Sequence, residues 1–312
     1  MLSEGVNTNP ISWRTVLFIS YHDLNNPDFL ELYSGAHAAL TDAYCRLSLC
    51  VTGDGHSSDP IADERAALLW AAKDTQIAGL ILWYIGGEAN LPALQAFQAT
   101  GRPLVFVDRL PPGIEADYVG VDNREAASAI VRALIARGHR RIAHLTYAET
   151  TSTVVERHEG YRSALEDHGL EYDKSLVVPV TYTHRGYDPA LEDLLRFWRL
   201  FPGDPPTAVF AVNDTMAQLT ANAAYAIGLR VPEDLAIAGF DGAEMRSAAG
   251  IVPFFTTAEQ PLEQMGREAA YLLAERLKQP APPAVFRHVT LQAPVVQRAS
   301  TEITLPGARA WP

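Results

Sequence analysis

Cysteine and basic residues are scarce in this sequence. Only Cys45 and Cys50 occur among 312 residues, and two thiols five residues apart suit neither a disulfide framework nor a metal site. We therefore expect a protein of the reducing cytoplasm. The 25 lysines and arginines are outnumbered by 37 aspartates and glutamates, which gives a net charge of −12. Because nucleic acids are bound by cations that displace counterions, this chain alone is expected to bind DNA poorly.

Long apolar runs and catalytic motifs are missing too. No segment approaches the roughly 18–20 apolar residues that span a bilayer, and the first fifteen residues lack the basic start and apolar run of a secretory signal. The sequence contains no P-loop, no G-x-S-x-G elbow and no H-E-x-x-H, and Gly53-Asp54-Gly55 is interpreted as a turn. His139 follows a helix end and is expected at the surface. We predict no enzyme, cofactor, metal or membrane partner.

The residues that are present alternate between short β-branched runs and stretches of 3.6-residue period. Asn26-Pro27, Asp122 or Asn123, and Pro261 each open a predicted helix, and Gly138 ends one of them. Strand–helix alternation predicts doubly wound parallel sheets, and this number of strands favours two α/β lobes. The predicted strands are 16–20, 47–52, 78–82, 104–108, 141–145, 176–180, 208–211 and 235–240.

Ligands of open α/β sheets bind beyond the carboxyl ends of the strands, so the residues that follow each predicted strand form the candidate site. Aromatic faces can cover the C–H edges of a sugar ring, and paired polar atoms can hold vicinal hydroxyls. The pattern therefore indicates a polyhydroxylated ligand. The candidates at strand ends are Tyr21, His22, Asp23, Trp83, Tyr84, Asp108, Asn213 and Asp241, and Phe29 and Ser152 on predicted helices are added to them.

Several of these candidates have a structural alternative. Asp214 is interpreted as the N-cap of the following helix, which leaves Asn213 as the better ligand candidate. Asp241 with Gly242 would otherwise be a simple turn. Trp83 and Tyr84 would otherwise pack a lobe, and Tyr21 and His22 would otherwise lie in a solvated loop.

Arg157 enters the candidate set on a different argument. Thr153 and Glu156 form a capping-box pattern, which places Arg157 in the first helical turn, where the macrodipole disfavours a cation. A broken local rule near a proposed cleft indicates function. We expect truncation of Arg157 to weaken ligand binding and to leave stability almost unchanged. The alternative is a surface salt bridge with Glu156 or Glu159.

An ordered set of segments resembles the effector-binding region of the lactose/galactose-repressor (LacI/GalR) family of transcription regulators. The resemblance covers about 14–300 and implies the periplasmic-binding-protein type I fold, with two lobes linked by crossovers near Val121, Phe255 and Thr290. The implied lobes are 14–121 with 256–289 and 122–255 with 290–301, preceded by a linker remnant (1–13) and followed by a tail (302–312). The segments are NNPDFLELYSGAHAAL, PLVFVDR, DYVGVDNREAASAIVRALIARGHRRIAHL, ERHEGYRSALEDHGL, TAVFAVNDTMA, GLRVPEDLAIAGFDG and FTTAEQPLEQMGREAAYLLAERL.

The resemblance also implies a function and four contact residues. Members of this family close their two lobes on a small effector, often a sugar or nucleobase, and the family's contact positions match Asp108, Arg157, Asn213 and Asp241. A homodimer is implied as well, for which we expect contributions from 63–73, 89–99 and 242–254. The predicted partners are a carbohydrate effector in the interlobe cleft and a second copy of the chain.

The sequence departs from the family pattern at its start. Such regulators begin with a helix-turn-helix domain of about 60 residues, whereas the first predicted strand here starts near residue 14. We therefore expect an effector-binding region without its helix-turn-helix, which would reach operator DNA only through such a domain. The alternative function is a sugar-binding protein of an ABC importer, which shares the fold.

Overall fold

The chain folds into two compact units. Met1–Gly120 and Leu262–Val289 form unit 1, and Val121–Pro261 and Thr290–Pro312 form unit 2. The computed structural model describes residues 13–53, 59–148, 151–180, 189–200, 205–243, 246–247, 250–251, 253–278 and 285–303. Most of the predicted linker remnant (1–13) and tail (302–312) lies outside these residues. No helix in the described part of the chain is long and apolar enough to cross a membrane.

The second crossing between the units differs from the sequence-based expectation. The chain leaves unit 2 after Pro261 and not near Phe255, so the assignment of 256–261 to the first lobe is wrong. The reason is backbone pairing, because Thr256 bridges to Ala238 and Glu259 bridges to Asp241, both in unit 2. The other two crossings follow Gly120 and Val289.

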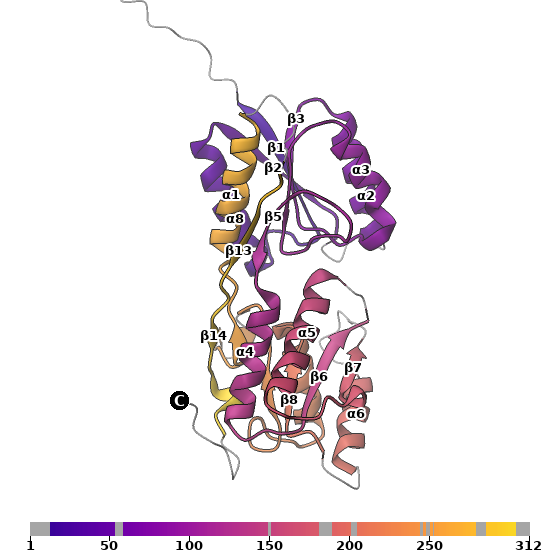
Figure 1. Ribbon diagram of the computed structural model, residues 1–312, viewed down its shortest axis with the longest axis vertical. Helices are drawn as coiled ribbons and strands as arrows, with labels where there is room; N and C mark the ends of the chain where they lie inside the picture. The colour runs from indigo at the N-terminus through magenta and orange to yellow at the C-terminus, as the bar shows by residue number, and fades with distance from the viewer. Residues whose placement is uncertain are drawn as a thin grey trace, which may run out of the picture. The chain divides into compact units, whose positions relative to one another are not determined.

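Unit 1 is built on a six-stranded sheet in the order β13-β5-β4-β3-β1-β2. Its strands are β1 (Arg14–Ser20), β2 (Cys45–Val51), β3 (Ile77–Leu82), β4 (Leu104–Val107), β5 (Asp117–Val121) and β13 (His288–Leu291). The pairs among β1 to β5 are parallel, and the residues of β4 are buried on both faces. Helices α1 (Pro27–Asp42) and α8 (Leu262–Arg276) cover one face, and α2 (Pro60–Lys73) and α3 (Leu91–Gln98) cover the other (Figure 1).

Two glycines let α1 and α8 pack in direct backbone contact. A Cβ on Gly35 would lie 2.0 Å from the carbonyl oxygen of Glu263, and a Cβ on Gly266 would lie 1.9 Å from that of Leu32. Neither position has room for a methyl group, because the facing atoms belong to a rigid helical backbone. This contact attaches a helix made late in the chain to the first helix.

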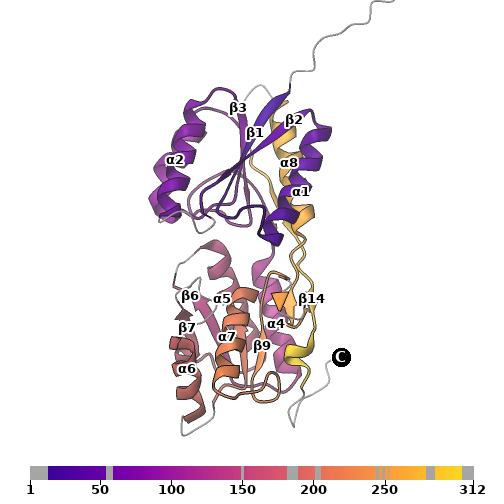
Figure 2. The same cartoon turned by 180° about the vertical axis from the view of Figure 1, so that it is seen from behind.

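Unit 2 contains a four-stranded, fully parallel sheet in the order β7-β6-β8-β9. Its strands are β6 (Ile142–Tyr147), β7 (Val177–Val180), β8 (Ala208–Ala211) and β9 (Ala236–Ala238). Helices α4 (Asn123–Ala136) and α5 (Ser152–Asp167) lie on one face, and α6 (Pro189–Leu200) and α7 (Asp214–Ala226) lie on the other (Figures 1 and 2). Short antiparallel pairs join β10 (Arg246–Ser247) to β11 (Gly250–Ile251) and β12 (Thr257–Ala258) to β14 (Val295–Val296).

The prediction of doubly wound parallel sheets in two lobes is confirmed, and the eight predicted strands overlap β1 to β4 and β6 to β9. Asn26 and Asp122 cap α1 and α4 as predicted, and Gly138 takes a φ of 97° after α4. The strand pattern missed β5, which contains Gly120, and the strands β10 to β14, of which four are only two residues long.

The predicted surface position of His139 is wrong. His139 is only 1% exposed, and its Nδ1 lies 2.9 Å from Thr207 Oγ1. His144 is fully buried on β6, and its Nδ1–H must donate to the Phe210 carbonyl oxygen at 3.0 Å because that atom can only accept. Burial lowers the pKa of His139 to about 4 and that of His144 to about 3. Both imidazoles are therefore neutral at pH 7.

His139 and His144 are expected to contribute less to the stability of unit 2 as the pH falls from 7.5 to 5.5. In the unfolded chain both histidines have a pKa near 6.5 and become protonated in this window, whereas folded His139 and His144 stay neutral. The unfolded state therefore binds more protons than the folded state. The expected loss is about 1.4 kcal/mol for each histidine. Urea unfolding of the unsubstituted chain and of His144→Gln, which keeps a donor for Phe210, measures it at both pH values, and the unsubstituted chain should lose about 1.4 kcal/mol more than the variant. An equal loss in the variant would contradict the assignment.

Candidate functional site

In unit 1, the chain segments that leave β1, β3 and β4 bring Trp83 and Asp108 together. Trp83 Nε1 donates a hydrogen bond of 3.0 Å to Asp108 Oδ2. Asp108 is 5% exposed and has a φ of 65°. Two hydrogen bonds hold its backbone in this conformation: its N–H donates to the Val119 carbonyl, and its carbonyl accepts from the Tyr118 hydroxyl. Its other carboxylate oxygen, Oδ1, is buried and has no hydrogen-bond partner. That oxygen is therefore an acceptor without a hydrogen-bond donor among the described residues.

Aromatic rings gather beside this pair. The His22 ring lies 5.3 Å from the Trp83 ring and 5.0 Å from the Tyr21 ring, both at steep angles. Gly53 makes room for Tyr21, because a Cβ there would lie 2.4 Å from the tyrosine ring. Burial and, to a smaller extent, the positive charge of Arg109 lower the pKa of His22 to about 4. His22 therefore presents a neutral ring at pH 7. We name Tyr21, His22, Trp83 and Asp108 the Asp108 cluster.

Three candidates in unit 1 have other tasks. Phe29 is 0% exposed and packs against Trp83 with ring centres 6.2 Å apart, so it supports that ring and offers no surface of its own. Tyr84 is 3% exposed, belongs to the apolar core, and donates its hydroxyl to the Gly87 carbonyl. The Asp23 carboxylate accepts from Asn25 at the turn before α1. Phe29 and Tyr84 thus lie in the core of unit 1, and their ligand contacts stay predictions.

In unit 2, Arg157 is the centre of a buried polar network. Its Nε donates to Asn123 Oδ1 at 2.9 Å, and its Nη1 donates to the Val212 carbonyl at 2.8 Å. Its Nη2 lies 3.0 Å from Asp241 Oδ1, and its guanidinium carbon stacks 3.6 Å from the centre of the Phe240 ring. Arg157 is only 5% exposed. Asn123 was missed from the sequence, because as the first residue of α4 it could not be told from a capping residue.

The helix argument that singled out Arg157 is wrong. Helix α5 begins at Ser152 after an N-cap at Thr151, so Thr153 is not the cap and Arg157 lies in the second turn. Glu156 accepts a hydrogen bond of 3.1 Å from Asn123 Nδ2 and does not form the expected capping box. The surface-salt-bridge alternative is wrong as well, since the ion pair with Asp241 is buried. Ser152 is simply the first residue of α5.

Asn213, and not Asp214 as predicted, is the capping residue of α7. Asn213 is the N-cap of α7, and its Oδ1 accepts from the Met216 N–H at 2.9 Å and from the Tyr147 hydroxyl at 3.3 Å. Asp214, predicted to be that cap, is fully buried and accepts from Gly242 N and Thr257 Oγ1, both at 3.0 Å. Burial and the nearby charge of Asp241 raise the pKa of Asp214 well above its usual range.

Asp241 itself sits in a strained backbone position. Its φ is 108°, and its Oδ1 accepts from Gln260 Nε2 at 2.9 Å in addition to the contact with Arg157. Among the described residues, only Tyr44, Asp108 and Asp241 combine a side chain with positive φ. Such strain persists where the surroundings enforce it, often at ligand sites. A simple turn at Asp241-Gly242 therefore does not account for the side-chain contacts of Asp241 with Arg157 and Gln260. We name Asn123, Arg157, Asn213 and Asp241 the Arg157 cluster.

Comparison with known proteins identifies the family. A model described as periplasmic binding protein-like domain matches residues 131–301. The repressor CytR of Escherichia coli is 30% identical over 276 residues, which cover 88% of this chain and 76% of CytR. The chain belongs to the LacI family of transcriptional regulators. The regulator CelR of Thermobifida fusca is 35% identical over 204 residues, which cover 64% of this chain and 57% of CelR, so the matched segment spans less than two thirds of that relative.

Solved structures of LacI-family regulators have the same fold. A complex of the regulator CelR with cellobiose aligns with a TM-score of 0.75 at 29% identity, covering 93% of this chain and 86% of CelR. A LacI-family regulator from Mycobacterium smegmatis also aligns with a TM-score of 0.75, at 26% identity, covering 92% of this chain and 98% of the regulator. These relatives are regulators and not enzymes, and they favour a ligand-sensing regulator over an importer's solute-binding protein.

Each of the two clusters includes or adjoins an ion pair. Asp108 lies beside Arg109, whose Nε is 3.4 Å from its Oδ2, and Arg157 is paired with Asp241. In each case one anion is matched by one cation, and Arg109 is that cation although it is not a member of the Asp108 cluster. No group of three or more histidine, cysteine, aspartate or glutamate side chains that could hold a metal ion occurs within the described ranges.

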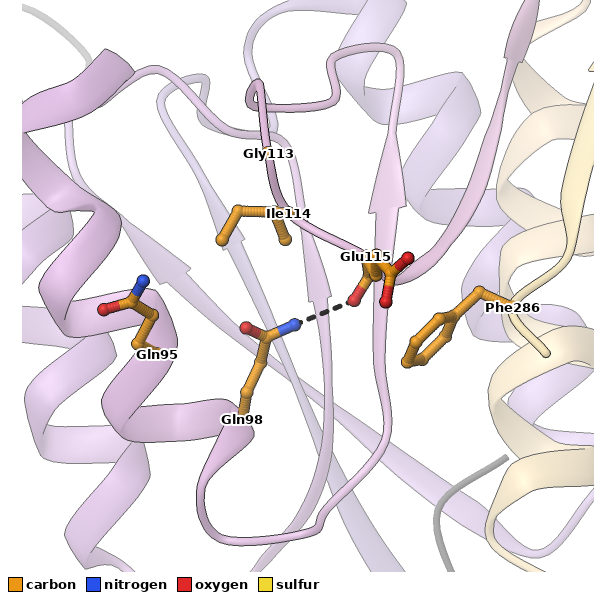
Figure 3. A pocket seen from close by; sticks show the side chains of 6 residues that line it. All are labelled: Gln95, Gln98, Gly113, Ile114, Glu115 and Phe286. Atoms are coloured by element: carbon orange, nitrogen blue, oxygen red, sulfur yellow. Dashed lines mark hydrogen bonds between the residues drawn. The ribbon is translucent and has the colours of Figure 1, made fainter. Parts of the chain in front are cut away.

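A separate surface hollow of unit 1 lies away from these residues. Gln95, Gln98, Gly113, Ile114, Glu115 and Phe286 line it (Figure 3). Gly113–Glu115 precede β5, so the hollow lies at the amino end of that strand. Gln98 Nε2 donates to the Glu115 carbonyl across it at 2.9 Å. Because ligands of such sheets bind at the carboxyl ends, we do not place the effector there.

Proposed function

We propose that this chain is the effector-sensing region of a LacI-type regulator, that the Asp108 cluster of unit 1 binds a small neutral sugar, and that the Arg157 cluster of unit 2 supplies effector contacts of its own. The observation that carries the proposal is the Trp83–Asp108 pair. The carboxylate fixes the indole through one oxygen, while the other oxygen, buried and unpartnered, is left to accept from a hydroxyl. An aromatic face next to a free carboxylate oxygen is the chemistry that recognises a sugar ring.

The regulator acts, in this proposal, as a cytoplasmic homodimer whose operator contacts come from a helix-turn-helix domain. The names of CelR and CytR both describe regulators of the helix-turn-helix type. Helix α2 supports dimer formation, because Ile61, Leu69 and Trp70 remain 39%, 40% and 49% exposed on it. The segments 63–73, 89–99 and 242–254 are the proposed interface, although several residues of the last lie outside the described ranges. The region itself performs no catalysis.

Calorimetry with a ligand panel tests the sugar assignment. The panel contains cellobiose, which occurs in the CelR complex, together with ribose, glucose, glucose 6-phosphate, glucosamine, cytidine, adenine and amino acids. We expect a neutral sugar to bind with a Kd in the micromolar range and the charged sugars to bind more weakly, because the anion of each cluster is matched by a cation. Binding of a nucleoside or nucleobase alone would overturn the sugar assignment without affecting the family.

A further inference from the structure

A buried carboxylate from α2 holds the segment that follows β3. Glu64 is 0% exposed. Its Oε1 accepts from the Ile85 backbone N–H at 2.8 Å, and its Oε2 accepts from Asn90 Nδ2 at 2.8 Å. Ile85 and Asn90 belong to the segment 83–90, which starts with Trp83. Both carboxylate oxygens are therefore used as acceptors for donors of this one segment.

The other contacts of the segment leave it little freedom. Asn90 Nδ2 also donates to the Ile61 carbonyl at 2.9 Å, and Asn90 Oδ1 accepts from Arg65 Nε at 3.0 Å. Gly86 fits only because it lacks a side chain, since a Cβ there would lie 2.4 Å from Glu64 Oε2. The segment is thus attached to α2 through a set of polar contacts with Glu64 at its centre.

Trp83 lies between the end of the sheet and the residues that are bound to Glu64. Its backbone N–H donates to the Ile19 carbonyl at 3.0 Å, which is a contact with the end of β1. Two residues later the chain is held by Glu64. The direction of the backbone at Trp83, and with it the direction of the indole toward Asp108, is therefore set on one side by the sheet and on the other by Glu64.

We propose that Glu64 is a positioning residue for effector binding, which holds the segment 83–90 and thereby keeps the Trp83 ring on Asp108. The proposal rests on the proposed function, because it takes the Trp83–Asp108 pair as an effector contact. Glu64 itself touches no effector in this account. Its effect reaches the ligand only through the position of the indole.

Protonation of Glu64 should loosen the segment. Burial raises the pKa of Glu64 to about 6. The hydrogen bonds from Asn90 and Ile85 and the positive charge of Arg109 lower this pKa, but by less than burial raises it. Tyr84 also faces Glu64, and Arg65 approaches it through Asn90. Protonation removes the negative charge, which weakens both oxygens as acceptors, and it adds an O–H donor at a site where the neighbouring groups are donors. The hold on the segment is therefore complete above pH 6 and weakens as the pH falls through 6.

The same shift has the opposite effect on folding. Because the pKa is raised in the folded state, the folded chain holds more protons than the unfolded chain between pH 4.5 and 6. The contribution of Glu64 to the free energy of unfolding therefore declines as the pH rises through this window. Effector affinity and the stability contributed by Glu64 thus change in opposite directions with pH.

Fluorine NMR of the chain labelled with 5-fluorotryptophan tests the proposal without a ligand. Trp83→Phe identifies the Trp83 resonance. We expect Glu64→Gln, which places an NH2 group against a donor, to shift and broaden that resonance and to leave the other tryptophans unchanged. The matched control is Asp117→Asn, which removes another buried carboxylate of unit 1, paired with Arg276 at 2.7 Å. The control should leave Trp83 in place. An unchanged Trp83 resonance in folded Glu64→Gln would overturn the proposal.

A pH titration and a binding measurement complete the test. In the unsubstituted chain the Trp83 resonance should move between pH 5.5 and 8 with a midpoint near 6, and the movement should vanish in Glu64→Gln. A resonance that stays fixed over this range in the unsubstituted chain also overturns the proposal, even if Glu64→Gln does not fold. At pH 7.5, Glu64→Gln should bind cellobiose at least tenfold more weakly, and Asp117→Asn should bind within twofold. If cellobiose fails to bind the unsubstituted chain, the sugar assignment loses support while the fluorine measurements still decide the role of Glu64.

Discussion

Arg157→Ala should destabilise unit 2 by about 3–5 kcal/mol and abolish effector binding. The substitution removes the guanidinium that joins Asn123, the Val212 carbonyl and Asp241, and it takes the cation away from the Asp241 carboxylate and from the face of the Phe240 ring. Removing the buried partner of such an ion pair costs several kcal/mol. The contacts thus contradict the expectation from the sequence that Arg157 serves binding alone.

Urea unfolding followed by a signal of unit 2, together with calorimetry, measures both effects. The control is Arg162→Ala on the same helix, because the Arg162 side chain is 57% exposed and pairs with Glu166 one turn away. That change should cost less than about 1 kcal/mol and leave binding intact. Arg157→Lys should recover little of either property, since an ammonium cannot reach three partners in one plane. Equal stabilities for the two alanine variants would refute this account of the network.

Asp108→Asn is expected to weaken sugar binding by about 30- to 150-fold, a loss of about 2–3 kcal/mol. Asparagine can still accept from the Trp83 indole, and it tolerates positive φ at least as well as aspartate. The fold of unit 1 should therefore change by less than about 1 kcal/mol. The variant loses the negative charge of the carboxylate whose Oδ1 has no partner. Its neutral amide cannot accept a charge-assisted hydrogen bond from the ligand.

Calorimetry with the sugar that binds best in the panel measures the loss. The control is Asp74→Asn, at the opposite end of the sheet, where the side chain accepts from the Gln76 N–H before β3. This control makes the same change of charge and should bind within twofold of the unsubstituted chain. An Asp108→Asn variant that binds as well as the control would show that Oδ1 does not meet the ligand.

The fold was predictable because buried parallel strands carry a strong local signal. Runs such as 104–107 are apolar throughout, and capping residues such as Asn26 and Asp122 make contacts within three positions of themselves. The elements that escaped prediction depend on distant partners. β12 exists because it pairs with β14, and no property of either two-residue strand reveals the other. The second crossing was misplaced for the same reason.

The candidate site was predictable by position and less so by role. Reading the residues after each strand selected Trp83, Asp108, Asn213 and Asp241, all of which lie in the two clusters. The sequence could not show which of Asn213 and Asp214 caps α7, because asparagine and aspartate are equally good capping residues. Asn123 was missed because it could not be told from a capping residue, and Glu64 was missed because a polar residue inside a helix gives no sign that it faces a distant loop. Arg157 was selected, but the reason given for it was wrong.

The order in which the chain is made has a consequence for how the two units fold. Unit 1 needs α8, whose backbone packs against Gly35 of α1, and α8 follows the whole of α4 to α7. Unit 2 needs the segment after Val289, because Thr256 bonds to Ser300 and Arg298. During synthesis, therefore, the apolar face of α1 stays uncovered until α8 has left the ribosome. Because this face is exposed while all of α4 to α7 is made, aggregation during production should begin at α1 and not at the later helices.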